Sequence, residues 1–248
     1  MKIYLLASTA MTDGMAEFLK DQSLSWEHES TCSDSELLAE AAGRVCYMSF
    51  GELQHRKSNK SYLSNIIRNG HESVLEHANF TLLIDGISRA LSHQLVRHRV
   101  GFAYSQLSQQ YHDESGCEFV EPEWLSDEDD LKKQWQAWAE NTRSLYKAML
   151  DAPSKLASSD LAAREILRGA RSAARSVLPN ATKTTLVVTA NARAWRNLLA
   201  VRGNIGGDLE MRSYCVDIYK ILVKESANFF EDFSLVSDEL GPMVVKSK

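Results

Sequence analysis

The segment NFTLLIDGISRALSHQLVRHR, residues 79 to 99, decides how the middle of this chain folds. Residues 79–85 form an apolar run of the length and composition typical of a strand. Residues 87–96 place apolar side chains at helical spacing, which predicts a helix with one buried face. This face consists of Ile87, Ala90, Leu91 and Leu95. We therefore expect a strand and then a helix that leads directly into the triplet Arg97-His98-Arg99.

The other segments indicate further strands and a larger number of helices. Strands are expected at residues 2–6 and 184–190, the second because of its β-branched composition. Six helices are expected. The first begins at the cap residue Ser33 and ends at Tyr47, and the second contains Tyr62, Ile66 and Ile67 and ends at Asn69-Gly70. The other four contain Trp135, Trp138, Leu145 and Met149; run from near Asp160 to Pro179; run from Asn191 to Gly203; and contain Met211, Tyr214, Cys215, Ile218, Ile221 and Leu222. In the first helix of this series Leu37, Ala41 and Val45 follow Ser33 along one face. We interpret residues 121–132 as an exposed connection and Trp135 and Trp138 as core or subunit-interface residues.

Length and element pattern together predict the fold class. The chain has 248 residues, of which 44% are hydrophobic, so a sizeable core can form. Helices dominate and strands lie between them, which favours an α+β protein with a small central sheet flanked by helices. We expect a single domain over residues 1–248.

Charge and cysteine usage exclude several classes of protein. The net charge of −5 provides no general basic field for nucleic acid or for a membrane surface. The four cysteines are isolated from one another, and none lies beside a base that would activate a thiolate. The first residues contain no apolar segment long enough for a signal peptide or a membrane span. We therefore expect a soluble, unprocessed, cytoplasmic protein without nucleic-acid or membrane partners.

The tract RHRVGFAYSQLSQQYHD, residues 97 to 113, carries the first candidate site. Arg97 and Arg99 offer forked donors that suit phosphate, and His98 between them can donate or accept a hydrogen bond. A dense series of hydroxyl and amide side chains follows, and amides can pair with the alternating carbonyl and N–H groups of a uracil or flavin ring. The alternative is a solvated loop after a helix, in which the two arginines serve only the helix C-terminus.

The second candidate site is NARAWRNLLAVRGN, residues 191 to 204. On a helix Arg193 and Asn197 share one face, whereas Arg202 lies on the apolar face with Trp195, Leu198 and Leu199. A guanidinium in that position extends its head to water, pairs with a carboxylate such as Asp208 or Glu210, or faces a ligand.

Two weaker patterns remain. Arg164, Arg168, Arg171 and Arg175 share one helix face, where like charges repel unless acids or a phosphate neutralise them. A nucleic-acid-binding helix is the functional alternative, disfavoured because no aromatic side chains alternate with the arginines. His71 and His77 in HESVLEH do not have the spacing of a zinc site, so we interpret them as structural and expect no metal.

Five segments in this order resemble the flavin-dependent thymidylate synthases. They are HESVLEH, HQLVRHR, YSQLSQQY, ARSVLPN and NARAWRNLLAVRGN, and together they cover nearly the whole chain. The resemblance implies the fold of the thymidylate synthase-complementing proteins, assembled as a homotetramer whose active sites draw on more than one subunit. It implies FAD as the cofactor, NADPH as the reductant and methylenetetrahydrofolate as the one-carbon donor for the methylation of dUMP to dTMP.

The resemblance also assigns roles to residues of this chain. FAD would be held by Ser73, Arg97, His98, Arg99, Gln106, Asn191, Arg193 and Asn197. The nucleotide would be bound by Gln94, Arg97, Gln106, Leu107, Ser108, Gln109, Gln110, Arg175 and Arg202. Arg202 would be the catalytic residue, because a cation that polarises the uracil ring stabilises the negative charge that develops there.

Two stretches of the chain depart from the family pattern. The triplet and Ser108 are separated by one residue more than is usual, and Gln110 stands where the family has an arginine that contacts the nucleotide. Gly206 replaces a histidine that touches FAD, and its neighbour Ile205 replaces an acid. Two alternatives therefore stay open: a related flavoenzyme that methylates UMP or another pyrimidine nucleotide, and a nucleotide- or flavin-binding relative without turnover.

Overall fold

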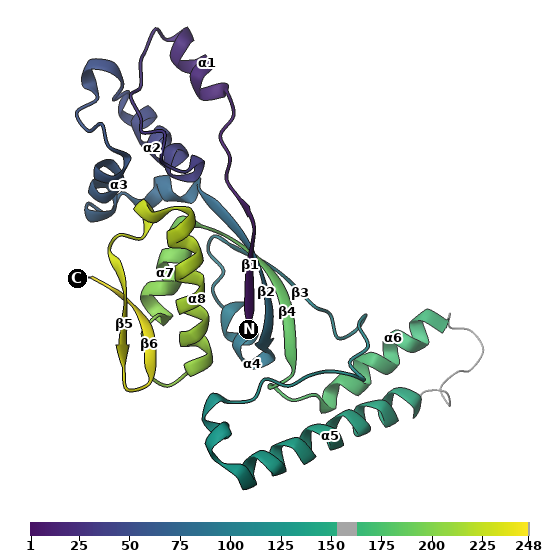
Figure 1. Cartoon of the computed structure of the whole chain (residues 1–248). Helices are drawn as coiled ribbons and strands as arrows, with labels where there is room; N and C mark the ends of the chain where they lie inside the picture. Colours follow the sequence, from purple (N-terminus) through teal and green to yellow (C-terminus); the bar gives the residue numbers. More distant parts are fainter. Residues whose placement is uncertain (153–162, 248) are drawn as a thin grey trace. The chain divides into compact units, whose positions relative to one another are not determined.

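A computed structural model describes residues 1–152 and 163–247 of the chain and confirms the α+β class (Figure 1). The described residues divide into two compact units. The first unit contains Met1–Lys2, Ile84–Arg97 and Ser105–Leu186, and the second contains Ile3–Leu83, His98–Tyr104 and Val187–Lys248. The single domain over residues 1–248 stays a prediction.

The main sheet has four strands in the order β1-β2-β4-β3. These strands are β1 (Lys2–Ser8), β2 (Asn79–Ser88), β3 (Phe102–Gln106) and β4 (Lys183–Asn191). The three strands expected from the sequence are confirmed, and β2 buries Phe80, Leu82 and Ile84 completely by alternation. The strand β3 was not expected, because its hydroxyl and amide side chains hide a weak alternation of exposure.

The strand β2 runs three residues further than expected, which corrects the start of the following helix. The helix α4 begins at Arg89 and ends at Leu95. Ser88 is its N-cap, since its hydroxyl accepts a hydrogen bond from Leu91 N at 3.0 Å. Ile87 is buried, as expected, but it belongs to the strand and not to the apolar face of the helix.

The first unit contains α4 and two longer helices. These are α5 (Asp129–Asp151) and α6, which is described from Ala163 to Ala174, and the two lie side by side (Figure 1). The helix start expected near Asp160 lies outside the described residues. The connection at 121–132 is less exposed than expected, because it contains a 3-10 turn at Glu123–Asp127 whose Leu125 is buried. The rings of Trp135 and Trp138 lie in a tilted contact with their centroids 4.8 Å apart, and Trp138 stays partly exposed at 37%.

The second unit contains the other helices and a separate hairpin. The helices are α1 (Gly14–Asp21), α2 (Asp34–Tyr47), α3 (Asn59–Arg68), α7 (Ala192–Arg202) and α8 (Leu209–Glu225). Short 3-10 segments lie at Gly51–Leu53, Glu72–Glu76 and Ala227–Phe229, and the hairpin consists of β5 (Phe233–Asp238) and β6 (Gly241–Lys246). The N-cap residues Ser33 and Asn191 are confirmed, Ser33 within a complete capping box. On α2 Leu37 and Ala41 are buried but Val45 is exposed, so the expected apolar face is one turn too long.

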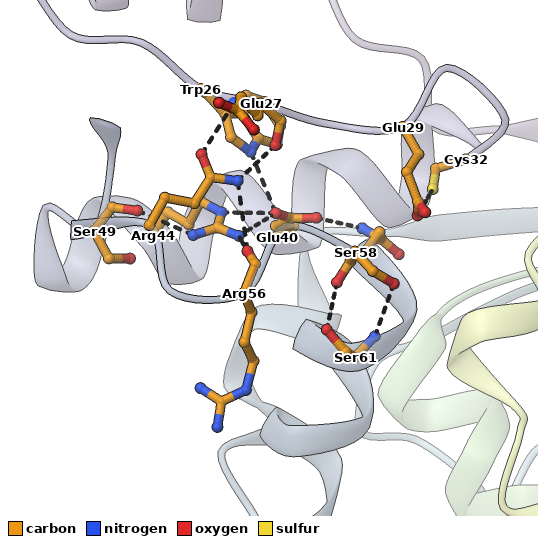
Figure 2. Close-up of polar contacts among 12 residues, drawn as sticks. Trp26, Glu27, Glu29, Cys32, Glu40, Arg44, Ser49, Arg56, Ser58 and Ser61 are labelled. Atoms are coloured by element: carbon orange, nitrogen blue, oxygen red, sulfur yellow. Dashed lines mark hydrogen bonds and ion pairs between the residues drawn. The ribbon is translucent and has the colours of Figure 1, made fainter. Parts of the chain in front are cut away.

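A buried ion pair joins α2 to the segments around it (Figure 2). The Arg44 Nε donates to Glu40 Oε1 at 2.6 Å, and both side chains are almost completely buried. Trp26 and Asn59 also donate to the Glu40 carboxylate, while the Arg44 guanidinium donates to the Ser49 carbonyl at 3.0 Å. Every partner is therefore provided by the protein itself, which a buried ion pair requires.

The described residues contain no helix that is both long enough and apolar enough to cross a membrane.

Candidate active site

The turn after the arginine triplet packs against the start of α7. Gly101 has φ +76°, a conformation that favours glycine. Its carbonyl accepts from Asn191 N at 3.3 Å, while the Asn191 side chain caps α7 by accepting from Ala194 N at 2.9 Å. A Cβ on Gly101 would lie 2.7 Å from Asn191 Nδ2 and 2.9 Å from Ala194 Cβ. The close approach therefore holds the end of the triplet against the cap of the second candidate segment.

Replacing Gly101 by alanine is expected to lower the free energy of unfolding by about 2 kcal/mol, since the left-handed conformation costs about 1–2 kcal/mol. The new methyl group would also displace the Asn191 side chain from the cap. Urea unfolding measures the loss. The matched control is Gly70→Ala, because Gly70 has φ +71° but no atom within 4 Å of its Cβ position. An equal loss in both variants would contradict the close packing at Gly101.

His98 and Arg202 meet in the second unit. The Arg202 Nε lies 3.5 Å from His98 Nε2, although the two residues are 104 positions apart. Burial and, to a smaller extent, the Arg202 charge lower the pKa of His98. The imidazole is therefore neutral at pH 7, so its Nε2 can accept the hydrogen bond from Arg202. Tyr104 Oη donates to the His98 carbonyl at 2.9 Å and fixes the backbone of the triplet.

Arg202 lies at the end of the buried apolar face of α7. Trp195, Leu198 and Leu199 are completely buried, and Phe102 of β3 packs edge-on against Trp195 at 5.1 Å. Arg202, one turn after Leu198, is only partly buried. The face that the sequence predicted for α7 is thus confirmed, and it ends in a cation beside an imidazole.

The outer face of α7 carries Arg193 and Asn197, both exposed as the spacing predicted. Arg193 Nη1 lies 2.6 Å from Glu76 Oε1, and its Nε lies 3.9 Å from Glu72 Oε2. The two acids of HESVLEH therefore meet α7, while His71 and His77 are exposed. An anionic cofactor bound by Arg193 would have to replace these carboxylates.

The remaining expected cofactor residues are placed as follows. Within the second unit Ser73 and Arg99 are exposed, and Asn191 is partly buried at the cap of α7. In the first unit Arg97 is exposed and Gln106 is partly buried. In the part of the chain that the structure describes, neither Arg97 nor Arg99 forms an ion pair with a carboxylate. Two exposed guanidinium groups without carboxylate partners fit the phosphates of a dinucleotide.

The residues expected to bind the nucleotide lie in the first unit, Arg202 excepted. Gln106 Nε2 donates to Ser92 Oγ at 2.9 Å and approaches Thr184 Oγ1 at 3.3 Å, which fixes the orientation of its amide. Ser108 is the first residue of a turn. Its carbonyl accepts a hydrogen bond from His112 N at 2.9 Å, and its hydroxyl accepts one from Gln110 N at 3.3 Å. Ser108 and Arg175 are exposed, as Arg97 is, whereas Gln94, Leu107, Gln109 and Gln110 are partly buried.

Sequence reasoning missed two charged residues beneath this turn, Arg89 and Glu114. Arg89 Nη2 donates to the Leu107 carbonyl at 2.7 Å. Glu114 is only 3% exposed, and its Oε1, like the Arg89 Nε, has no hydrogen-bond partner among the described residues. Burial lowers the pKa of Arg89 and raises that of Glu114, and in each case the other's charge opposes the shift. The available signal was an arginine in the first turn of α4, two residues before the buried Leu91.

The basic row is only partly one helix face. Arg164, Arg168 and Arg171 lie in α6, but α6 ends at Ala174 and Arg175 begins a 3-10 segment, Arg175–Val177. Glu165 pairs with Arg168 at 2.5 Å, and Arg171 Nη1 donates to the Tyr111 carbonyl at 2.7 Å. Arg168 and Arg171 therefore have structural partners, whereas Arg175 lies beyond the end of α6.

Three of the four cysteine thiols have raised pKa values, and the described part of the chain shows no cluster of metal ligands. Burial raises the pKa of Cys32 to about 12, that of Cys117 to about 11 and that of Cys215 to about 12. These thiols stay protonated at pH 7. Over residues 1–152 and 163–247 no group of three or more His, Cys, Asp or Glu side chains could hold a metal ion.

Comparison with known proteins shows the family to which the chain belongs. Residues 29–226 match the family model described as thymidylate synthase complementing protein. A protein of Corynebacterium aurimucosum is 39% identical over 96% of this chain and 92% of its own length. One of Mycobacterium leprae is 37% identical over 100% of this chain and 95% of its own, and one of Corynebacterium diphtheriae is 38% identical over 89% and 88%. All three are named flavin-dependent thymidylate synthase, and this chain belongs to the thymidylate synthase complementing protein family.

Proposed function

We propose that this protein is a flavin-dependent thymidylate synthase, which methylates dUMP to dTMP. The observation that carries the proposal is the pair of His98 and Arg202, a neutral imidazole beside a cation at the end of an apolar helix face. When bound, FAD reduced by NADPH supplies hydride, and methylenetetrahydrofolate supplies the one-carbon unit. The residues of this chain bind and orient these molecules and stabilise charge.

The proposed FAD residues provide the groups that a dinucleotide requires. Arg97 and Arg99 would neutralise its phosphates, and Arg193 would join them if the phosphates displaced Glu76. With Nε2 accepting from Arg202, neutral His98 carries its proton on Nδ1 and can donate it to the flavin. Ser73, Gln106, Asn191 and Asn197 complete the proposed FAD set. Gly206 is exposed and has open space at its Cβ position, so position 206 offers FAD no side chain.

Arg202 is the proposed catalytic residue. The uracil ring carries extra negative charge when its C5 attacks an electrophilic carbon, and a cation beside N3 and O4 lowers the energy of that state. A guanidinium keeps its charge at every working pH, and its partner His98 is neutral. Neutral His98 adds no second positive charge beside Arg202, and the guanidinium charge can act on the ring.

The nucleotide would be bound by the turn at Ser108 and by the residues around it. Gln94, Arg97, Gln106, Leu107, Ser108, Gln109, Gln110 and Arg175 form the proposed set, together with Arg202. We add Arg89 as a residue that supports the turn, because it holds the Leu107 carbonyl and brings a partly buried cation beneath it. This cation partly offsets the charge that is absent at Gln110.

The decisive experiment is the release of tritium from C5-labelled dUMP and, in parallel, from C5-labelled UMP. The reaction contains FAD, NADPH and methylenetetrahydrofolate. Preferential release from dUMP supports thymidylate synthesis. Preferential release from UMP supports the second candidate, a related pyrimidine nucleotide methylase, which the glutamine at position 110 favours. Release from neither nucleotide would contradict both and leave a binding protein without turnover.

Replacing Gln110 by arginine is expected to tighten the binding of dUMP. The new guanidinium would restore a charge-assisted contact with the nucleotide, which is worth about 1.5–3 kcal/mol, or roughly tenfold to a hundredfold in Kd. Isothermal titration of dUMP into the FAD-loaded protein measures the change. The matched control is Gln136→Arg, because Gln136 is exposed on α5. Equal affinities in the wild type and the Gln110 variant would show that the side chain does not face the nucleotide.

We also infer a homotetramer, as the family resemblance implied. The support is the set of exposed apolar side chains on α5 and α6, with Leu145 51% and Leu167 43% exposed. Light scattering at micromolar concentration tests this state, and a monomeric mass would contradict it.

A further inference from the structure

The end of the chain folds beyond the segment that matches the family model. That match stops at residue 226, whereas β5 and β6 form an antiparallel hairpin that pairs Phe233 with Lys246 and Asp238 with Gly241. Val244 of β6 is only 1% exposed, and β6 contacts both α7 and α8. The hairpin therefore packs against α7 and α8 through β6, while β5 is exposed after Phe233 (Figure 1).

The hairpin meets α7 at the residue that follows Arg202. Val244 N donates to the Gly203 carbonyl at 3.0 Å. A Cβ at Gly203 would lie 2.6 Å from the Val244 carbonyl oxygen and 2.9 Å from Val244 Cβ, so only glycine permits this approach. The last carbonyls of a helix have no partner within the helix, and β6 provides one here. The last turn of α7, which carries Arg202, thus depends on the hairpin for a hydrogen bond.

A buried arginine of α8 holds the hairpin closed. Arg212 is 2% exposed and contacts Asp238 with both terminal nitrogens, at 3.1 Å and 2.5 Å. Its Nε donates to the Pro242 carbonyl at 2.8 Å, and its Nη2 also donates to the Gly241 carbonyl. One guanidinium therefore binds both strands at the turn of the hairpin, and the planar fork fixes its geometry.

A second buried arginine ties α7 to the start of the hairpin. Arg196 donates to the two carboxylate oxygens of Asp232 at 2.6 Å and 2.7 Å, and Glu72 lies 3.5 Å away. Arg196 lies six residues before Arg202 on the same helix. The two arginines thus attach both ends of the hairpin to the helices on which the proposed catalytic residue depends.

We propose that the C-terminal hairpin is a positioning element for Arg202: Asp238 and Arg212 lock the hairpin, Val244 holds the last turn of α7 through Gly203, and the Arg202 guanidinium is thereby kept beside His98. Asp238, Arg212 and Val244 belong to neither the proposed FAD set nor the proposed nucleotide set, so we assign them a positioning role. The catalytic part of the proposal rests on the proposed function. The placement of Arg202 beside His98 can be tested without it.

The test replaces Asp238 by asparagine in the full-length, FAD-loaded protein. Asparagine keeps the size of the side chain but removes the charge and one of the two acceptors for Arg212. The matched control is Glu239→Gln, which makes the same change of charge on the neighbouring exposed acid. The two readouts are the pKa of His98, followed by NMR of the imidazole, and the separate values of kcat and KM for dUMP.

With the hairpin unlocked, Arg202 should move away from His98, whose pKa should rise because the nearby positive charge is lost. We expect kcat to fall at least about tenfold, since a displacement of the order of 1 Å can cost about a hundredfold, while KM changes little. In Asp238→Glu, which keeps the carboxylate, kcat and the pKa of His98 should lie closer to the wild-type values than in Asp238→Asn. The Glu239→Gln control should match the wild type in each of them.

Wild-type values of the His98 pKa and of kcat in Asp238→Asn would overturn the proposal. If that variant does not fold, Arg212→Lys is measured with the same two readouts and the same criteria, because it keeps the buried charge and loses the fork. If the wild type itself shows no turnover, the proposed function fails. The His98 pKa then still decides whether the hairpin positions Arg202.

Discussion

Replacing Arg202 by alanine is expected to abolish methyl transfer to dUMP while FAD stays bound. The lost guanidinium would otherwise stabilise negative charge on the uracil ring, and removing one such group costs about a hundredfold to a thousandfold in kcat. Single-turnover tritium release from C5-labelled dUMP measures this loss, and the flavin absorbance of the purified protein reports whether FAD remains. The pKa of His98 should rise in the same variant, because the Arg202 charge helps to lower it.

Two further variants make this result specific to the guanidinium. Val201→Ala changes the exposed neighbour on α7 and should leave kcat unchanged. Arg202→Lys keeps a positive charge but loses the planar fork, and we expect it to recover only part of the rate. Unchanged turnover in Arg202→Ala would remove the residue from the mechanism. Loss of FAD together with turnover would instead make it a cofactor-binding residue.

Replacing Glu40 by alanine is expected to cause the largest loss of stability. Glu40 is completely buried and Arg44 is 1% exposed, so the variant leaves a buried cation without its anion (Figure 2). Removal of one partner from a buried ion pair costs about 3–5 kcal/mol. Trp26 and Asn59 lose an acceptor as well. Urea unfolding followed by tryptophan fluorescence measures the change in the free energy of unfolding.

The exposed pair Lys57–Glu27 provides the comparison. Its atoms are as close, at 2.7 Å, but the side chains are 70% and 67% exposed. Glu27→Ala should therefore cost at most about 1 kcal/mol, as exposed ion pairs do. The double variant Glu40→Leu with Arg44→Met should recover much of the stability that Glu40→Ala loses, because it buries no charge. A loss below that of Glu27→Ala would show that water reaches the Glu40–Arg44 pair.

The family and the fold class are confirmed, whereas the roles of individual residues stay predictions. The family follows from five motifs, each a contiguous stretch of sequence, and the α+β class follows from the pattern of strands and helices; both are confirmed. The assignment of residues to FAD and nucleotide stays a prediction, although the structure orients Gln106 and brings His98 to Arg202. Arg89 and Glu114 show what motif reading misses, because neither belongs to a motif and their importance arises from burial.

Local physical chemistry explains what the sequence by itself determined. Ser33 and Asn191 cap helices by bonding to an N–H three residues later, so the signal and its effect lie within one turn. The apolar face of α7 and the alternation in β2 likewise depend only on the period of the backbone. These features could be predicted without knowing any neighbour in space.

Only the tertiary structure decided the features that depend on distant partners. The polar tract becomes the strand β3 because it pairs with β4, with Phe102 packed against Trp195, and Gly203 is needed as glycine because Val244 approaches it. His98 is neutral because burial and Arg202, 104 residues away in sequence, both disfavour its charge. Burial and long-range contact are properties of the folded chain, so sequence spacing carries no direct signal for them.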